Sequence, residues 1–282
     1  MENHSGHAQA HHSGHHGHGG ARPGGLSVSE HGYTLELDAT IRTAGVQRIA
    51  FRVLGPDARP VTSFVAEHEK ELHLIAVRRD TAGFQHVHPV RDGEGTWSVE
   101  LALEPGDWRI FADIHPAGHD GTLTLGADLA VAGPYDPRPL PEAVRTARIG
   151  EYTVTLDGEL LPGEARALTL TVRRDDRPVT DLQPYLAAYG HLVALRVGDL
   201  GYLHVHPEGA PGDGTTAPGP EIAFVAIAPS AGTYRLFLDF QHEGVVRTAE
   251  FTVPTGTAAP HPTAAARAAS GHDGHHHGHA HH

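Results

Sequence analysis

Residues 67–89 read EHEKELHLIAVRRDTAGFQHVHP, and this stretch sets the expected fold. It holds two segments of alternating apolar residues, ELHLIAVRR and FQHVHP, joined by a short turn. Alternation with a period of two predicts β-strands, and two such segments around a turn predict a hairpin. Similar short segments, closed by Gly, Pro or Asp, fill the chain on both sides. The sequence therefore predicts an all-β protein of the sandwich type.

The hairpin occurs twice in the chain. Residues 60–89 align without a gap on residues 178–207, and 12 of the 30 positions are identical, including three histidines. An internal repeat of this kind predicts two tandem β-sandwich domains. The expected organisation is a His-rich tail (1–24), a first sandwich domain (25–133), a Pro-rich linker (134–148), a second sandwich domain (149–254) and a second His-rich tail (255–282).

Histidine is far more frequent than in ordinary proteins. The 282 residues include 26 histidines and no cysteine, and Met1 is the single methionine. Both tails are rich in small residues and have little to bury, so we expect them to be disordered without a ligand. Two plainer interpretations stay open: the C-terminal run is a purification tag, or both tails are solvated spacers.

The chain carries a formal net charge of −13 when its histidines are neutral. An acidic protein repels nucleic acid and anionic lipid, which argues against both as partners. The longest apolar runs fall well short of the roughly 18 residues that a membrane span needs, so we expect no membrane insertion. Met1 leads directly into polar residues without a signal peptide, which predicts a cytoplasmic location for the chain as written.

The three histidines of the first hairpin are expected to converge. A two-residue turn at Asp80-Thr81 pairs residues whose numbers sum to 161, which places His88 opposite His73. His86 and His88 share one face of their strand because side chains alternate along it. Cross-strand Cβ atoms lie ~4.5–5.5 Å apart, so the three imidazoles come within reach of one divalent ion.

The second hairpin predicts a second site of the same kind. His206 lies opposite His191, and His204 shares a face with His206. A neighbouring strand of each copy carries an aspartate, Asp113 in the first and Asp239 in the second. We expect each carboxylate to be a fourth ligand or an acceptor that orients a histidine. Both groups are expected on the outer face of a sheet, with the segment before each hairpin as a lid.

The ligand types narrow the choice of metal. Imidazole and carboxylate without sulfur suit Zn(II), Cu(II), Ni(II) or Fe(II), and do not suit Cu(I). We expect Cu(II) or Zn(II), which the sequence does not separate. The alternative is that the imidazoles are paired with backbone carbonyls, because an internal duplication copies structural residues as well as ligands.

Three stretches carry a resemblance to a known family: residues 67–89, DLQPYLAAYGHLVALRVGDLGYLHVHP (181–207) and PSAGTYRLFLDF (229–240). They resemble uncharacterised bacterial His-rich proteins, secreted or membrane-anchored, that are loosely described as heavy-metal-binding. The resemblance covers most of residues 25–254 and implies immunoglobulin-like β-sandwiches. It also implies a metal-related role outside the cytoplasm, in contrast to the missing export signal.

Three functions are open at this point. The first is a non-enzymatic protein that binds Cu(II) or Zn(II) as a buffer, scavenger or chaperone and serves a metal transporter or acceptor protein. The second is a metal-dependent oxidoreductase, because GFQHVHP resembles the HVH strand of copper–zinc superoxide dismutase; that family also needs a disulfide, and this chain has no cysteine. The third is an adhesion or interaction module whose histidines sense pH.

Overall fold

The computed structural model describes residues 23–203 and 205–256. The tails beyond these ranges and His204 lie outside the described residues, as does the side chain of His206. The described part contains twenty β-strands and no helix, which confirms the all-β prediction. Accordingly, none of these residues belongs to a helix long and apolar enough to span a membrane.

The first domain is a sandwich of two five-stranded sheets. Its strands are β1 (Ser29–Glu30), β2 (Tyr33–Leu37), β3 (Ile41–Thr43), β4 (Gly45–Leu54), β5 (Leu72–Arg78), β6 (Phe84–Val87), β7 (Val90–Arg91), β8 (Thr96–Leu103), β9 (Gly106–Ile114) and β10 (Leu123–Ala132). One sheet has the order β1-β2-β4-β8-β7, and the other has the order β3-β10-β9-β5-β6.

The second domain is also a sandwich of two sheets. Its strands are β11 (Thr146–Ile149), β12 (Tyr152–Asp157), β13 (Ala165–Arg174), β14 (Arg177–Pro178), β15 (Gly190–Arg196), β16 (Tyr202–Leu203), β17 (Val205–Pro207), β18 (Glu221–Ile227), β19 (Thr233–His242) and β20 (Val245–Pro254). One sheet has the order β11-β12-β13-β18-β17 with β14 paired to β13, and the other has the order β16-β15-β19-β20.

Both strand orders are those of an immunoglobulin fold. In the first domain, β2, β4, β8 and β7 occupy the places of strands A, B, E and D, and β5, β9 and β10 those of C, F and G. In the second, β12, β13, β18 and β17 face β15, β19 and β20 in the same arrangement. The chain therefore consists of two tandem immunoglobulin-like β-sandwiches, as expected.

The alternation of apolar residues places one face of each strand in a core. In β19, Tyr234, Leu236, Leu238 and Phe240 all pack in the core of the second domain, as their spacing predicts. Phe237 lies on the opposite face of the strand and is nevertheless fully buried. Strand β5 is likewise buried at every position, so both of these strands are covered on two sides.

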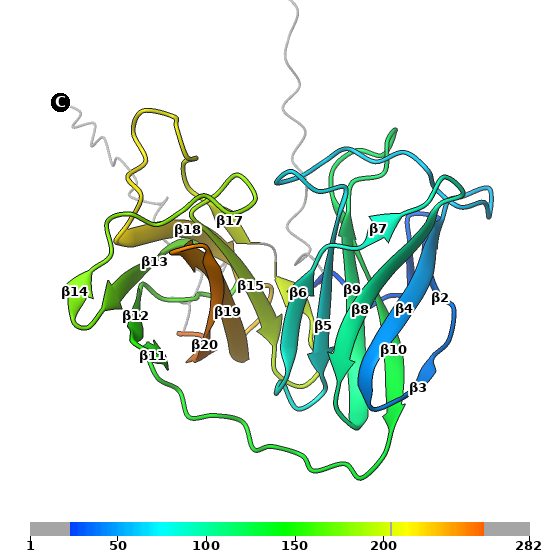
Figure 1. Ribbon diagram of the computed structural model, residues 1–282, viewed down its shortest axis with the longest axis horizontal. Helices are drawn as coiled ribbons and strands as arrows, with labels where there is room; N and C mark the ends of the chain where they lie inside the picture. The colour runs from blue at the N-terminus through cyan, green and yellow to red at the C-terminus, as the bar shows by residue number, and fades with distance from the viewer. Residues whose placement is uncertain (1–22, 204, 257–282) are drawn as a thin grey trace, which may run out of the picture.

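On their second side, β5 and β19 are covered by the other domain. A cluster of apolar side chains drawn from both domains, called here the interdomain cluster, fills the space between the β5 and β15 sheets: Ile75, Val77, Phe111, Val193, Leu195, Leu200, Tyr202 and Phe237. At its edge, the Phe84 ring stacks on the Phe237 ring with centroids 4.0 Å apart. Figure 1 shows β5 and β6 beside β15, so the faces predicted to point outward instead face each other.

The ends of the domains differ slightly from the sequence-based ranges. Figure 1 shows an extended segment from β10 to β11 along one side of both domains, and β11 begins at Thr146, inside the stretch assigned to the linker. Gly24, which was assigned to the N-terminal tail, forms a β-bridge with Tyr202 of the second domain.

The hairpins have the predicted registers. Ile75 lies opposite His86 in the first domain, and Ala194 lies opposite Leu203 in the second. Each HVHP segment is not one strand, however, because it crosses from one sheet to the other. Strand β17 pairs with β18, so His206 lies opposite Val225 and not opposite His191, as the register had predicted.

Candidate metal centre

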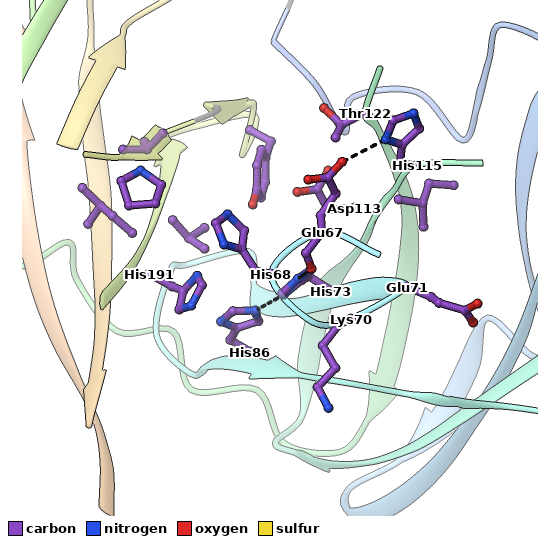
Figure 2. A pocket seen from close by; sticks show the side chains of 16 residues that line it. Glu67, His68, Lys70, Glu71, His73, His86, Asp113, His115, Thr122 and His191 are labelled. Carbon is purple, nitrogen blue, oxygen red and sulfur yellow. Dashed lines mark hydrogen bonds and ion pairs between the residues drawn. The ribbon is translucent and has the colours of Figure 1, made fainter. Parts of the chain in front are cut away.

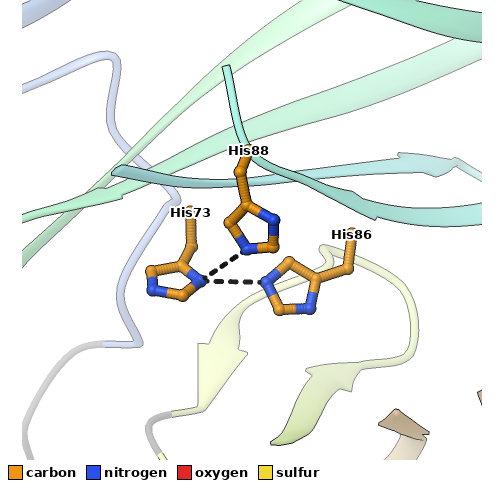
Figure 3. A group of neighbouring side chains, drawn as sticks. All are labelled: His73, His86 and His88. Carbon is orange, nitrogen blue, oxygen red and sulfur yellow. Dashed lines mark hydrogen bonds between the residues drawn. The ribbon is translucent and has the colours of Figure 1, made fainter. Parts of the chain in front are cut away.

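Three histidines of the first domain converge beside the interdomain cluster. His73 projects from β5, His86 from β6 and His88 from the crossing that follows β6. Each offers one ring nitrogen to a group whose members all lie within 4.8 Å of one another (Figure 3). Nδ1 of His73 lies 3.1 Å from Nε2 of His86 and 3.1 Å from Nε2 of His88. The spatial part of the hairpin prediction is therefore confirmed.

Hydrogen bonds on the far side of two rings define their tautomers. Nε2 of His73 lies 3.0 Å from the carbonyl oxygen of Glu67, which can only accept, so Nε2 donates and Nδ1 carries the lone pair. Nδ1 of His86 lies 2.8 Å from Oδ2 of Asp239 and donates to that carboxylate. In a neutral His86 ring, Nε2 then carries the lone pair, and it lies 3.1 Å from Nδ1 of His73.

These two nitrogens lie 3.1 Å apart, so a proton on one of them or a metal ion between them is required to hold them together. A third nitrogen, Nε2 of His88, lies equally close to Nδ1 of His73. Two imidazole nitrogens bound to one tetrahedral zinc ion lie about 3.3 Å apart, given Zn–N bonds of about 2.05 Å. The distances from His73 to His86 and to His88 are therefore close to those between two nitrogens on one zinc ion.

Burial keeps two of these rings neutral. Removal from water lowers the pKa of His73 to about 4 and that of His88 to about 3. The positive charge that a neighbouring protonated histidine would carry acts in the same direction in both cases. Neutral imidazole is the form that binds a metal, so these rings are in the ligand state at neutral pH.

The carboxylate that orients His86 comes from the second domain. The side chains of His86 and Asp239 are only 4% and 6% exposed, and their contact crosses between the domains. Oδ1 of Asp239 accepts a second hydrogen bond, of 2.6 Å, from the Thr248 hydroxyl. Asp239 was predicted to serve the second hairpin, and the structure places it against the first.

Asp113 takes a different position from the one expected of a ligand. It lies opposite His73 on β9, and its Oδ1 accepts a hydrogen bond of 2.9 Å from the Thr124 hydroxyl. It is not part of the three-histidine group. The repeat relates Asp113 to Asp239, which lies opposite His191 on β19 in the same way.

His191 lies near the first-domain histidines. Its Nε2 donates to the carbonyl oxygen of Tyr185 at 2.8 Å, just as His73 donates to Glu67. Burial lowers the pKa of His191 to about 4. Because His204 and the His206 side chain lie outside the described residues, the second three-histidine site stays a prediction.

The expected lid is a tight turn in each domain. Glu67 and Lys70 form a two-residue hairpin in which His68 and Glu69 have positive φ values of 47° and 64°. Tyr185 and Ala188 bracket the matching turn in the second domain. The sequence did not reveal that the first carbonyl of each turn receives a histidine N–H, although the equal spacing of the two pairs was visible in the repeat.

A cavity of about 120 Å³ adjoins the three rings. His73, His86 and His191 line it together with Glu67, whose carboxylate lies 2.9 Å from Nδ1 of His115. Figure 2 shows the imidazoles of His68, His73, His86 and His191 gathered around one place. This cavity is therefore lined by residues of both domains.

Fold and geometry together define a tandem immunoglobulin-like protein with a buried histidine cluster between its domains. A family model described as Domain of unknown function (DUF8832) matches residues 27–130 and 147–257, which is more than half of the chain. The chain belongs to this family. No curated protein matches the chain.

Several solved structures are similar over most of the chain. MtrC from Shewanella baltica OS185 is 9% identical, with 81% of this chain and 71% of that one covered and a TM-score of 0.26. The D0-D1 domain of intimin is 14% identical, with coverages of 78% and 97% and a TM-score of 0.22. The fibronectin(III)-like modules of Clostridium thermocellum CbhA are 10% identical, with coverages of 86% and 100% and a TM-score of 0.22.

Proposed function

We propose that this protein binds a divalent transition metal, Cu(II) or Zn(II), through His73, His86 and His88. The observation that supports the proposal is the convergence of three ring nitrogens, two of them with lone pairs set by hydrogen bonds to Glu67 and Asp239. The N–H groups of His73 and His86 both point at acceptors, which leaves their remaining ring nitrogens facing each other, 3.1 Å apart.

The donor set fits these metals. Three imidazole nitrogens without sulfur suit Zn(II) and Cu(II), and the Irving–Williams order favours Cu(II) in solution. A carboxylate behind a metal-bound histidine fixes its tautomer and raises its basicity, and Asp239 is in position to do this for His86. Each of these features strengthens metal binding, and none of them acts on a substrate.

We propose a buffer, scavenger or chaperone rather than an enzyme. The His-rich tails contain clustered imidazoles, which raise the local concentration of metal near a higher-affinity site by effective-concentration effects. A metal transporter or acceptor protein is the proposed partner. Turnover of a redox substrate by the loaded protein would instead favour the oxidoreductase interpretation.

The test is a titration of the full chain with Zn(II). It is done in the presence of a competing chelator that is strong enough to remove zinc from the His-rich tails. Wild type is compared with the double variant His86→Ala/His88→Ala and with His31→Ala. His31 is a suitable control because its side chain is 63% exposed and lies outside the three-histidine group. The tails are the same in all three proteins.

The expected result is one ion that resists the chelator in wild type and in His31→Ala, and is absent from the double variant. Equal retention by all three proteins would overturn the proposal. Circular dichroism of each protein confirms that the double variant is still folded before the comparison is made.

A further inference from the structure

The ion bound by His73, His86 and His88 needs at least one further ligand in a tetrahedral site. We infer that His191, from the second domain, supplies it, so that the metal bridges the two domains. This inference rests on the proposed function and concerns the fourth position of the same site. It changes the assignment of His191 from a separate second-domain site to a shared one.

Ring spacing is the first observation. Two imidazoles on one tetrahedral ion have centroids about 5 Å apart. Within the group the centroids lie 5.3 Å (His73–His86), 4.9 Å (His73–His88) and 4.9 Å (His86–His88) apart. The His191 ring lies 6.3 Å from that of His73 and 6.2 Å from that of His86. Closing by about 1 Å brings it to that spacing from His73 and His86.

The tautomer of His191 is the second observation. Its Nε2 is committed to the Tyr185 carbonyl, so in the neutral ring Nδ1 carries the lone pair. Among the described residues, none hydrogen-bonds to that nitrogen. His73, its counterpart in the repeat, is held in the same way, and its lone pair is also on Nδ1. The Nε2 atoms of the two rings therefore make equivalent hydrogen bonds to the turns that precede their strands.

Enclosure is the third observation. His191 is 8% exposed and lines the same cavity of about 120 Å³ as His73 and His86. The second domain already contacts this site through Asp239. His68 is the competing ligand, since its ring lies 6.3 Å from that of His73 and 5.0 Å from that of His191, but it stands exposed at the tip of a turn. A buried, oriented ring loses less conformational freedom on binding than an exposed one.

The experiment distinguishes a metal ion with four protein ligands from one with three protein ligands and an exchangeable water. The full-length protein is loaded with Co(II), the chelator removes ions from the tails, and azide is titrated while the visible spectrum is recorded. A site with a bound water exchanges it for azide and changes its spectrum, whereas a site with four protein ligands does not. The variants are His191→Ala and, as the matched control, His68→Ala.

We expect wild type and His68→Ala to be insensitive to azide, and His191→Ala to keep its ion and become azide-sensitive. In zinc-loaded wild type, nitrogen NMR then shows a coordination shift at Nδ1 of His191. Azide sensitivity in wild type, or azide sensitivity produced by His68→Ala and not by His191→Ala, overturns the inference. The azide response and the NMR shift of wild type test whether His191 is a ligand even if His191→Ala does not fold.

The two proposals fail separately. If Co(II) does not bind in a manner that depends on His86 and His88, the proposed function itself is wrong and the inference falls with it. If Co(II) binds through those residues and wild type responds to azide, the metal-binding function stands and only the bridging role of His191 is lost.

Discussion

At the scale of single residues, Asp239 is the side chain outside the three-histidine group that most affects the proposed site. Its carboxylate fixes the tautomer of His86 from across the domain boundary. The matching Asp113 accepts from Thr124 and is not a member of the three-histidine group. The two aspartates are equivalent in sequence, and the way the domains pack gives them different surroundings.

We predict that Asp239→Asn weakens metal binding by about 10–100-fold, the range typical for the loss of a carboxylate behind a metal-bound histidine. Asp113→Asn serves as the control and is expected to have a smaller effect. Chelator competition measures both affinities, and equal losses in the two variants would contradict the role given to Asp239.

The buried histidines also predict how stability depends on pH. Burial holds the pKa values of His73, His88 and His191 at about 4, about 3 and about 4, below the ordinary value of 6.5. Between these values the unfolded chain binds more protons than the folded one, so the free energy of unfolding falls as the pH drops below about 6.5.

Urea denaturation of the metal-free protein at several pH values measures this slope. We expect the unfolding midpoint to decrease steadily from neutral pH towards pH 5. The variant His191→Leu removes one of the three groups and should flatten the dependence. A midpoint that is constant or higher in acid would show that these rings are not held neutral by burial.

At the scale of elements, the tight turns before β5 and β15 place the carbonyls that orient His73 and His191. Neither turn has the residues that such a conformation favours. His68 and Glu69 occupy the first turn at positive φ, where Gly and Asn are preferred. The residue types at these positions therefore do not account for the turn.

We predict that Glu69→Gly raises the free energy of unfolding by about 1 kcal/mol, because glycine adopts positive φ without the cost that a side chain incurs. Metal affinity should be unchanged. Lys70→Gly, at the neighbouring position with ordinary φ, is expected to lower stability. Thermal unfolding of both variants tests this, and the same sign for the two would contradict it.

At the scale of the whole molecule, the two domains pack through the faces that carry the histidines. The interdomain cluster and the Phe84–Phe237 stack hold β5 and β19 together. Asp239 lies two residues after Phe237 on the same face of β19. The geometry of the proposed metal centre therefore depends on domain packing at residues remote from the three histidines.

We predict that Phe84→Ala lowers the free energy of unfolding by roughly 2–3 kcal/mol, somewhat less than for a fully buried phenylalanine. It should also weaken metal binding by about tenfold, as expected when the orienting carboxylate is displaced. Phe51→Ala, in the first-domain core, is the control: it should destabilise the fold at least as much without changing metal affinity under native conditions. Equal affinities in the two variants would contradict the coupling.

The sequence alone determined the strands, the repeat and the hairpin register. These are local properties, because side chains alternate with a period of two and a short turn sets which residues face each other. For that reason the convergence of His73, His86 and His88 could be predicted from their spacing. The exit of β17 from the β15 sheet could not, since it depends on which distant strand offers unpaired backbone groups.

Tertiary structure alone decided what lies around the three histidines. Apolar residues such as Phe237, on a face that sequence assigns to the surface, bury themselves only by packing against the other domain. That packing brings Asp239 to His86 and His191 to the edge of the cluster. Contacts between residues more than a hundred positions apart follow from the docking of whole sheets, and the spacing within either repeat does not contain that information.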